Sequence, residues 1–427
     1  MSSNTSSRDL AENNATILSK AVVVTRASGA DGSYSDSDGS SCASQASTDM
    51  YEHEPFDTFV HKIHNLIATL FPNDIPIKVE RMSGGSFHRI LRGVLGCDKD
   101  TPRTVIVRIP RFPYLHHPHP NQVAVLRFLK STTTIPVPHV CWFDNSAENI
   151  LSEPFTILEH LPGSCLDDVY HDLPVDMKKS VARSVARLLK QFSEVTFDSI
   201  GTLLATSPDG IGINVGHVVY IANSSQYIPP PTPARARSVR DYLEERWTFF
   251  VAEEQLKNPG ESFYVKMTAD FRAAMGKLPI PDTPARIVLY HTDLAPRNIL
   301  IDTGSGAITG VLDWDDAESA PVEAAWQMPA WLWDNKACGS NDLKWVDPDD
   351  IPCDSEAAEI RQVFIDEIED ALPGFVETVR RNGLIFQLLA FARHGWYTEQ
   401  TIYQAGDFLE KLNVPFFLNK RKGSSRT

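Results

Sequence analysis

The sequence predicts an α+β chain in which a small β-rich lobe is followed by a larger, mainly helical lobe. Two observations support this prediction. Between residues 75 and 161, short runs of β-branched and other apolar residues are separated by glycine and polar turns, which is typical of antiparallel strands. Beyond Gly163, apolar residues recur at helical spacing over long stretches, which is typical of amphipathic helices.

We divide the 427 residues into four segments. Residues 1–50 are predicted to be a disordered Ser-rich tail, because residues 27–48 carry almost no large apolar side chains and cannot offset the entropy of folding. The small lobe occupies residues 51–160 and the helical lobe residues 161–418, and residues 419–427 form a basic tail. The Ser-rich tail has two open interpretations, a phosphorylation target and a solvated spacer.

The small lobe begins with a helix, because the apolar residues between Phe56 and Leu70 fall at i, i+3, i+4 and i+7 spacing. The other predicted elements of this lobe are, in chain order, strands at 75–81, 88–95 and 104–109, a helix at 122–130, and strands at 140–144 and 155–161. The first two strands are joined by the glycine-containing turn 83–86.

The spacing of apolar residues predicts three helical regions in the helical lobe. Apolar residues from Val181 to Phe192 mark one face of a long helix. A Pro-rich loop at 229–233 separates it from a second helical region around Trp247, and residues 356–412 are largely helical.

Composition excludes several classes of protein. The 40 Lys and Arg against 55 Asp and Glu give a net charge of −15, which disfavours a partner such as nucleic acid. Apolar runs are too short to cross a bilayer, so we expect no membrane partner.

Six scattered cysteines without a CxxC pair favour the reducing cytoplasm. No GxxxxGK[ST], HExxH or GxSxG motif occurs, which argues against P-loop NTPases, zincins and nucleophile-elbow hydrolases. The oligomeric state stays open.

The most informative segment is 286–313. A buried strand at 287–289 is followed by the sequence HTDLAPRN at 291–298, a short strand, a Gly-rich turn and a return strand that ends before Asp313. This pattern predicts a hairpin that brings Asp293, Asn298 and Asp313 together at its open end.

These residue types suit phosphoryl transfer. Asp293 can orient an attacking hydroxyl and accept its proton, and the oxygens of Asn298 and Asp313 are suitable ligands for Mg²⁺. The alternative, three polar residues on a surface turn, is disfavoured by the flanking strands and the glycine loop.

The HxDxxxxN motif, followed by Val-Leu-Asp313-Trp, resembles the catalytic and metal loops of the aminoglycoside phosphotransferase and choline kinase group, including fungal-type members of the phosphotransferase enzyme family. The similarity extends over about residues 55–400. It implies a bilobal protein-kinase-like fold with a small antiparallel sheet in the N-lobe and a larger helical C-lobe. It also implies that ATP and Mg²⁺ bind between the lobes and that the γ-phosphate passes to a hydroxyl of a small molecule.

The resemblance assigns roles residue by residue. It implies that Asp293 is the catalytic base, and that Asn298 and Asp313 are metal ligands. The nucleotide-binding residues that it implies are Ser83, Gly84, Gly85 and Ser86 of a phosphate-covering loop, Arg108 beside the α and β phosphates, and Glu159 and Leu161 of the hinge that holds the adenine.

Two departures from the family pattern concern the nucleotide site. Arg108 stands where the family usually has Lys, and Gln122 is the nearest equivalent of its Glu partner. Arginine keeps the charge and can chelate phosphate oxygens, but a neutral Gln holds it less firmly. The alternative function is therefore a kinase-like binding module with weak or no catalysis.

Three further groups have open interpretations. The acidic residues Asp315, Asp316 and Glu318 either face a cationic substrate or lie in a solvated loop. Four tryptophans, at positions 326, 331, 333 and 345, either line a pocket or pack in a core, and the core is favoured. The histidines of the segment 116–119 lack the spacing of metal ligands, which favours a solvated loop.

Overall fold

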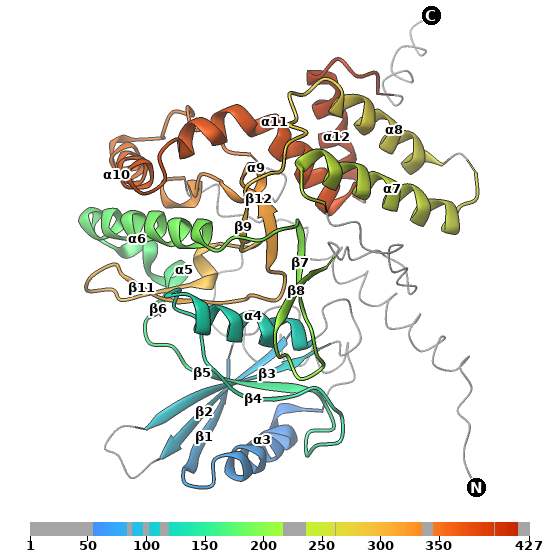
Figure 1. Ribbon diagram of the computed structural model, residues 1–427. Helices are drawn as coiled ribbons and strands as arrows, with labels where there is room; N and C mark the ends of the chain where they lie inside the picture. Colours follow the sequence, from blue (N-terminus) through green and yellow to red (C-terminus); the bar gives the residue numbers. More distant parts are fainter. Residues whose placement is uncertain are drawn as a thin grey trace, which may run out of the picture. The chain divides into compact units, whose positions relative to one another are not determined.

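The computed structural model describes residues 54–82, 88–96, 102–111, 119–216, 236–260, 262–334, 345–396 and 398–416 (Figure 1). The described residues fall into two compact units. Unit 1 takes those up to residue 119 and those of 140–160, and unit 2 takes those of 120–139 and those from 161 onward. Within the described part of the chain, no helix has both the length and the apolarity that a membrane crossing requires.

Unit 1 is an antiparallel sheet with one helix beside it (Figure 1). Its elements are α3 (Phe56–Leu70), β1 (Ile75–Arg81), β2 (His88–Gly96), β3 (Arg103–Pro110), β4 (Val140–Asp144) and β5 (Phe155–Glu159). The strand order is β1-β2-β3-β5-β4. This arrangement confirms the five strands and the first of the two helices predicted for the small lobe, except that β5 ends at Glu159 and not at Leu161.

The core of unit 1 lies between α3 and the sheet. Phe59, Ile63 and Ile67 of α3 are buried against inward residues of β2 and β3, which include Val105 and Val107. A Cβ atom on Gly93 of β2 would lie 2.7 Å from Ile67, so the absence of a side chain there allows the helix to approach the sheet closely. Residues 105 and 107 lie on the helix-covered face, and the alternation of strand side chains therefore directs Arg108 to the opposite face.

Unit 2 contains most of the helices and two small sheets. Its elements are α4 (His119–Thr132, from Pro120 onward), β6 (Ser164–Cys165), α5 (Leu166–Val169), η1 (Tyr170–Asp172), α6 (Val175–Glu194), β7 (Gly201–Ala205), β8 (Ile213–Gly216), α7 (Val239–Lys257), α8 (Phe263–Met275), β9 (Ile287–Tyr290), η2 (Pro296–Asn298), β10 (Ile299–Ile301), β11 (Ile308–Val311), β12 (Glu318–Pro321), α9 (Val322–Ala325), η3 (Ala330–Leu332), α10 (Ser355–Ala371), α11 (Phe375–His394) and α12 (Glu399–Lys411). Together with unit 1, it confirms the predicted α+β class.

An aromatic cluster forms the centre of unit 2. Trp247 of α7 is fully buried, with its ring centroid 5.6 Å from that of Trp396. Phe271 of α8 stacks on Trp396 at 4.7 Å, and Phe408 of α12 stacks on Phe271 at 5.7 Å. Stacked and tilted aromatic pairs of this kind join helices that are far apart in the sequence.

The two sheets of unit 2 position the segment 286–313. One has the order β11-β10-β6, and the other has the order β8-β7-β12-β9. β12 pairs antiparallel with β9, with Glu318 opposite Tyr290. Strands β7, β8 and β12 were not predicted from the sequence, because pairing with neighbouring strands defines them more than their own composition does.

The division into units differs from the predicted boundary at residue 160 in one segment, 120–139, which falls in unit 2. The side-chain oxygen of Asn121 accepts a hydrogen bond from the N–H of Ala205 in β7 at 2.9 Å. The carbonyl of Pro136 accepts one from the N–H of Val311 in β11 at 2.8 Å. These bonds attach the segment to the sheets of unit 2.

Candidate functional site

The β10–β11 hairpin forms as the sequence predicts. Ile299 pairs with Val311 in an antiparallel register. In the turn, the carboxylate of Asp302 accepts a hydrogen bond from the N–H of Ser305 at 2.8 Å. Gly306 has a φ of +72°, a conformation that glycine adopts without steric strain. The turn residues that the sequence predicted therefore take part in the hairpin.

The open end of the hairpin carries the candidate catalytic and metal-binding residues. The N–H of Leu312 donates to the carbonyl of Asn298 at 2.8 Å, which places the two strand ends opposite each other. Asp313 follows directly after Leu312 in the chain. The side chain of Asn298 contacts Asp293, so the three residues Asp293, Asn298 and Asp313 belong to one end of the hairpin.

His291 connects the two loops of this site. It is 3% exposed, its Nε2 lies 2.8 Å from the carbonyl oxygen of Leu312, and its Nδ1 lies 3.2 Å from the N–H nitrogen of Asp293. These partners require a neutral imidazole that donates through Nε2 and accepts through Nδ1. Burial lowers the pKa of His291, which favours the same neutral form. The ring packs against Phe192 and Trp314, with centroid distances of 6.5 and 4.6 Å.

Both carboxylate oxygens of Asp293 are held by neighbouring side chains. Nδ2 of Asn298 donates to Oδ2 of Asp293 at 2.9 Å and to its main-chain carbonyl at 2.8 Å. Oδ1 of Asp293 is ion-paired with Nη2 of Arg297. The side chain of Asp293 is nevertheless 39% exposed, so a substrate can reach it. Arg297 was not among the predicted site residues, and nothing in the sequence indicated the pair, because Asp293 and Arg297 lie in a turn and a short 3-10 helix rather than in one α-helix.

Asp313 has an unusual backbone conformation. Its φ is +63°, in the left-handed region that few residues other than glycine adopt. The next residue, Trp314, is 1% exposed and donates its indole N–H to the carbonyl of Val311 at 3.0 Å, which anchors the chain on both sides of the turn. Asparagine and aspartate tolerate this region better than other side chains, and such strained positions cluster at functional sites.

The oxygen atoms at this end fit a magnesium ion better than a softer metal. Because Nδ2 of Asn298 is bonded to Asp293, its Oδ1 is the atom that can bind a cation, and Asp313 supplies a carboxylate. Mg²⁺ is usually held by one or two carboxylates together with water and phosphate oxygens. No group of three or more His, Cys, Asp or Glu side chains able to hold a metal occurs among the described residues.

In unit 1, Arg108 lies on the central strand β3 and is 9% exposed. Its Nη2 lies 3.1 Å from Nδ1 of His88 on β2, a partner that the sequence analysis missed. Because Ile90 is directly opposite Arg108, His88 is its diagonal neighbour across the strand pair. Only the strand register could have revealed this contact. Glu159 ends β5 and pairs with Val105 of β3.

Several predicted residues contribute elsewhere or cannot be placed. Ser83, Gly84, Gly85 and Ser86 lie outside the described residues, as do the tails 1–50 and 419–427 and His116 and His117. Leu161 belongs to unit 2, where a Cβ atom on Gly310 would lie 2.9 Å from its side chain. Leu161 therefore packs on the β10–β11 hairpin. The pairing of Arg108 with Gln122 stays a prediction.

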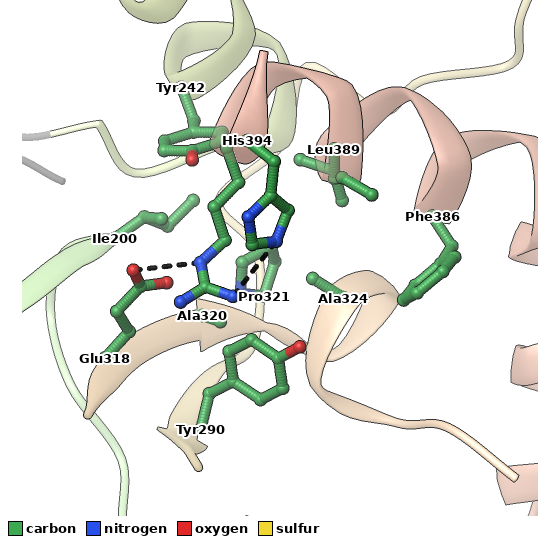
Figure 2. Close-up of a pocket in the computed structure, with 12 residues that line it drawn as sticks. Ile200, Tyr242, Tyr290, Glu318, Ala320, Pro321, Ala324, Phe386, Leu389 and His394 are labelled. Carbon is green, nitrogen blue, oxygen red and sulfur yellow. Dashed lines mark hydrogen bonds and ion pairs between the residues drawn. The ribbon is translucent and has the colours of Figure 1, made fainter. Parts of the chain in front are cut away.

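Glu318 lies in neither of its predicted environments. It is 7% exposed on β12, and its Oε1 accepts a hydrogen bond from Nε of Arg393 on α11 at 3.0 Å. The pair lines a cavity of about 30 Å³ together with Tyr290, Tyr242 and His394 (Figure 2). Both interpretations of Glu318, a solvated loop residue and a free charge for a cationic substrate, are therefore wrong. The partner was unpredictable because it is 75 residues away in the chain.

Two of the four tryptophans, Trp326 and Trp333, are half-buried and pack against buried aromatic side chains, so they lie at the edge of the core. Trp326 stacks on Phe375 with centroids 5.2 Å apart and donates its indole N–H to Oγ of Ser193 at 2.9 Å. Trp333 packs against Phe364 at 5.8 Å.

Comparison with known proteins gives a family match. The family model described as "Phosphotransferase enzyme family" matches residues 83–324, which is more than half of the chain. A subtelomeric hrmA-associated cluster protein of Aspergillus fumigatus is 26% identical over 304 residues, which cover 57% of this chain and 58% of that protein. Clavilactone A biosynthesis cluster protein Y of Ampulloclitocybe clavipes is 29% identical over 225 residues, covering 50% and 52%. The chain therefore spans little more than half the length of these relatives.

Among solved structures, aminoglycoside phosphotransferase APH(4)-Ia in a ternary complex with AMP-PNP and hygromycin B is similar at 15% identity. The match covers 85% of this chain and 99% of that chain, with a TM-score of 0.46. The streptomycin–ATP complex of APH(2'')-IIa is similar at 12% identity, covering 82% and 95%, with a TM-score of 0.45.

Proposed function

The chain belongs to the phosphotransferase enzyme family, and from this premise we propose that it transfers the γ-phosphate of ATP to a hydroxyl group of a small molecule. The observation that carries the proposal is the arrangement around Asp293. Its carboxylate accepts a hydrogen bond from Asn298, and the main chain of Asn298 is hydrogen-bonded to Leu312, the residue before Asp313. The family match supports phosphotransferase chemistry, and the residues at the hairpin end supply the groups that this chemistry needs.

In the proposed reaction, Asp293 orients the acceptor hydroxyl and accepts its proton. The acceptor oxygen forms a bond to the γ-phosphorus, and the bond between that phosphorus and the β–γ bridging oxygen breaks. The electron pair of the broken bond stays on ADP. His291 contributes indirectly, because it holds the main chain of Asp293 against that of Leu312.

The proposed metal site consists of Oδ1 of Asn298 and the carboxylate of Asp313. When bound there, Mg²⁺ would neutralise phosphate charge. In unit 1, Arg108 is proposed to bind the α and β phosphates, since its guanidinium is charged at any physiological pH and matches phosphate geometry. The glycine loop 83–86 and the hinge residues Glu159 and Leu161 complete the proposed nucleotide site.

We propose that the acceptor is a small molecule and that the reaction takes place in the cytoplasm. One relative is named for a clavilactone A biosynthesis cluster, which supports a small-molecule acceptor. The scattered cysteines support a reducing compartment.

A screen with labelled ATP and Mg²⁺ over alcohols, amino alcohols and sugars tests the proposal. We expect at least one acceptor to become labelled, and Asp293→Asn to abolish labelling while ATP binding survives, because the amide cannot accept the proton. Asp282→Asn is the matched control, since Asp282 is an exposed carboxylate of unit 2 paired with Arg240. ATP binding that needs no metal, with no acceptor labelled, would favour the alternative of a kinase-like binding module.

A further inference from the structure

Arg297 contacts the proposed catalytic base Asp293 and carries a positive charge. Its Nη2 is ion-paired with Oδ1 of Asp293, while Asn298 holds Oδ2. The two neighbours thus fix the carboxylate plane from both sides. We propose that Arg297 takes part in phosphoryl transfer: it orients Asp293, and its remaining N–H groups stabilise the negative charge of the phosphoryl group in transit. This inference rests on the proposed function.

The main chain of Arg297 is fixed, whereas its side chain is accessible. Residue 297 lies in η2, where the N–H of Asn298 donates to the carbonyl of Ala295 at 2.9 Å. The thiol of Cys165 lies 3.6 Å from the carbonyl oxygen of Arg297. The side chain is 43% exposed, close to the 39% of its partner Asp293. A substrate that reaches the exposed part of Asp293 therefore meets the guanidinium group as well.

Stability alone gives a weak reason for this ion pair. Exposed pairs of Arg with a carboxylate contribute little to folding, because water screens the charges and two long side chains must be ordered. The position of Arg297 on Oδ1 is therefore better explained by a role in the reaction.

The movement of charge during the reaction explains how Arg297 would contribute to phosphoryl transfer. When the acceptor proton passes to Asp293, the base loses its negative charge, and negative charge remains on the phosphoryl oxygens between acceptor and ADP. A guanidinium group has five N–H donors, and the bond to Asp293 uses one of them. The same cation can therefore bind the base before proton transfer and the phosphoryl oxygens during it. Preorganised donors of this kind stabilise the transition state more than the ground state.

The test measures turnover of labelled ATP with Mg²⁺ by the full chain, with water or an acceptor from the screen. We expect Arg297→Ala to lower kcat by about 100-fold with little change in KM for ATP, because the lost interaction is made in the transition state. Arg297→Lys should keep part of the activity, since it keeps the charge but not the fork. Added guanidinium ion should restore activity to Arg297→Ala but not to Asp293→Asn.

Arg187→Ala is the matched control, because Arg187 is an exposed arginine of α6 paired with Glu367. It should leave kcat and the response to guanidinium unchanged. Thermal unfolding of each variant separates a folding defect from a catalytic one, and Arg297→Gln replaces Arg297→Ala if the latter does not fold.

The outcomes separate the two proposals. If the wild-type chain turns over no ATP, the proposed function fails. If the wild type is active and Arg297→Ala is equally active, more active, or not restored by guanidinium, the role of Arg297 is overturned while the proposed function stands. An increase in activity would mean that Arg297 restrains the base.

Discussion

Nε2 of His291 lies 2.8 Å from the carbonyl oxygen of Leu312, so one buried imidazole joins the loop that carries Asp293 to the strand end that carries Asp313. The two segments are connected in the sequence only through the β10–β11 hairpin. A hydrogen bond from a buried neutral donor fixes their separation without introducing a charge beside the proposed metal site.

Replacing His291 should therefore destabilise the site through this bond. His291→Ala leaves the Leu312 carbonyl without its donor and creates a cavity beside Trp314, so we expect a loss of about 2–4 kcal/mol in the free energy of unfolding. His291→Gln can still donate from its side-chain nitrogen, and should lose about half as much. Urea unfolding followed by tryptophan fluorescence measures both. Equal losses in the two variants would show that the hydrogen bond contributes nothing.

Asp313 has a left-handed backbone and is also a proposed metal ligand. Two substitutions that differ in their tolerance of a positive φ can test these two roles separately. Asp313→Asn and Asp313→Ala both remove the carboxylate, and both should abolish the Mg²⁺-dependent part of the thermal shift that ATP produces. Alanine tolerates a positive φ poorly, so Asp313→Ala should unfold with about 1 kcal/mol less stability than Asp313→Asn. An unchanged Mg²⁺ dependence in Asp313→Asn would argue against Asp313 as a ligand.

Gly163 and Gly260 have similar backbone conformations, with φ values of +115° and +120°, but different surroundings. A Cβ atom on Gly163 would clash with Oγ1 of Thr309 and lie 2.8 Å from the carbonyl oxygen of Ile301, whereas a Cβ atom on Gly260 meets nothing within 4 Å. Gly260→Ala should lose about 1–2 kcal/mol from backbone strain alone. Gly163→Ala should lose at least about 1 kcal/mol more, because the clash displaces β6 from β10.

Thermal or urea unfolding of the two glycine variants supplies the comparison. The wild-type sequence is the common reference, and ATP-dependent stabilisation reports on the hairpin separately. Losses of equal size would mean that the close approach at Gly163 is relieved by small movements of Thr309.

The buried His394 predicts that the free energy of unfolding decreases when the pH is lowered. Burial, with the nearby Arg393 second, lowers the pKa of His394 to about 3 from an ordinary value of 6.5. Below pH 6.5 the unfolded chain binds a proton at this histidine that the folded chain does not, so stability decreases as the pH falls. Between pH 7 and pH 5 the expected loss from His394 is about 2 kcal/mol.

His394→Gln keeps an acceptor for Arg393 and removes the titration, so its stability should depend less on pH than that of the wild type. Urea unfolding at pH 7, 6 and 5 measures the difference. His61→Gln, at an exposed position of α3, is the control for the substitution itself. A wild-type slope that His394→Gln does not reduce would contradict the prediction.

Local sequence was sufficient for much of the candidate site. Asp302, Ser305 and Gly306 form the turn, the flanking apolar residues form two strands, and the hairpin register then places Asn298 opposite Leu312. All of these contacts join residues within 16 positions of one another, so a pattern in one short segment encodes them. The ion pair of Asp293 with Arg297 also joins two residues that are close together in the sequence.

Contacts between distant segments were not predictable in this way. Arg108 meets His88 because β2 and β3 pair in one particular register, and the sequence alone permits other registers. Glu318 of β12 meets Arg393 of α11 although they are 75 residues apart, and the sequence indicated only a solvated loop or a cationic substrate for Glu318. The short strands β7 and β12 were missed for the same reason, since pairing with neighbours defines them more than their own composition does.

The sequence by itself determined the α+β class, the hairpin and the identity of the chemical groups at its open end. The tertiary structure decided which charges are buried, which strands pair and which unit the segment 120–139 joins. The physical reason is that periodicity and turn residues act over a few neighbouring positions, whereas burial and pairing depend on surfaces that meet only after the chain has folded.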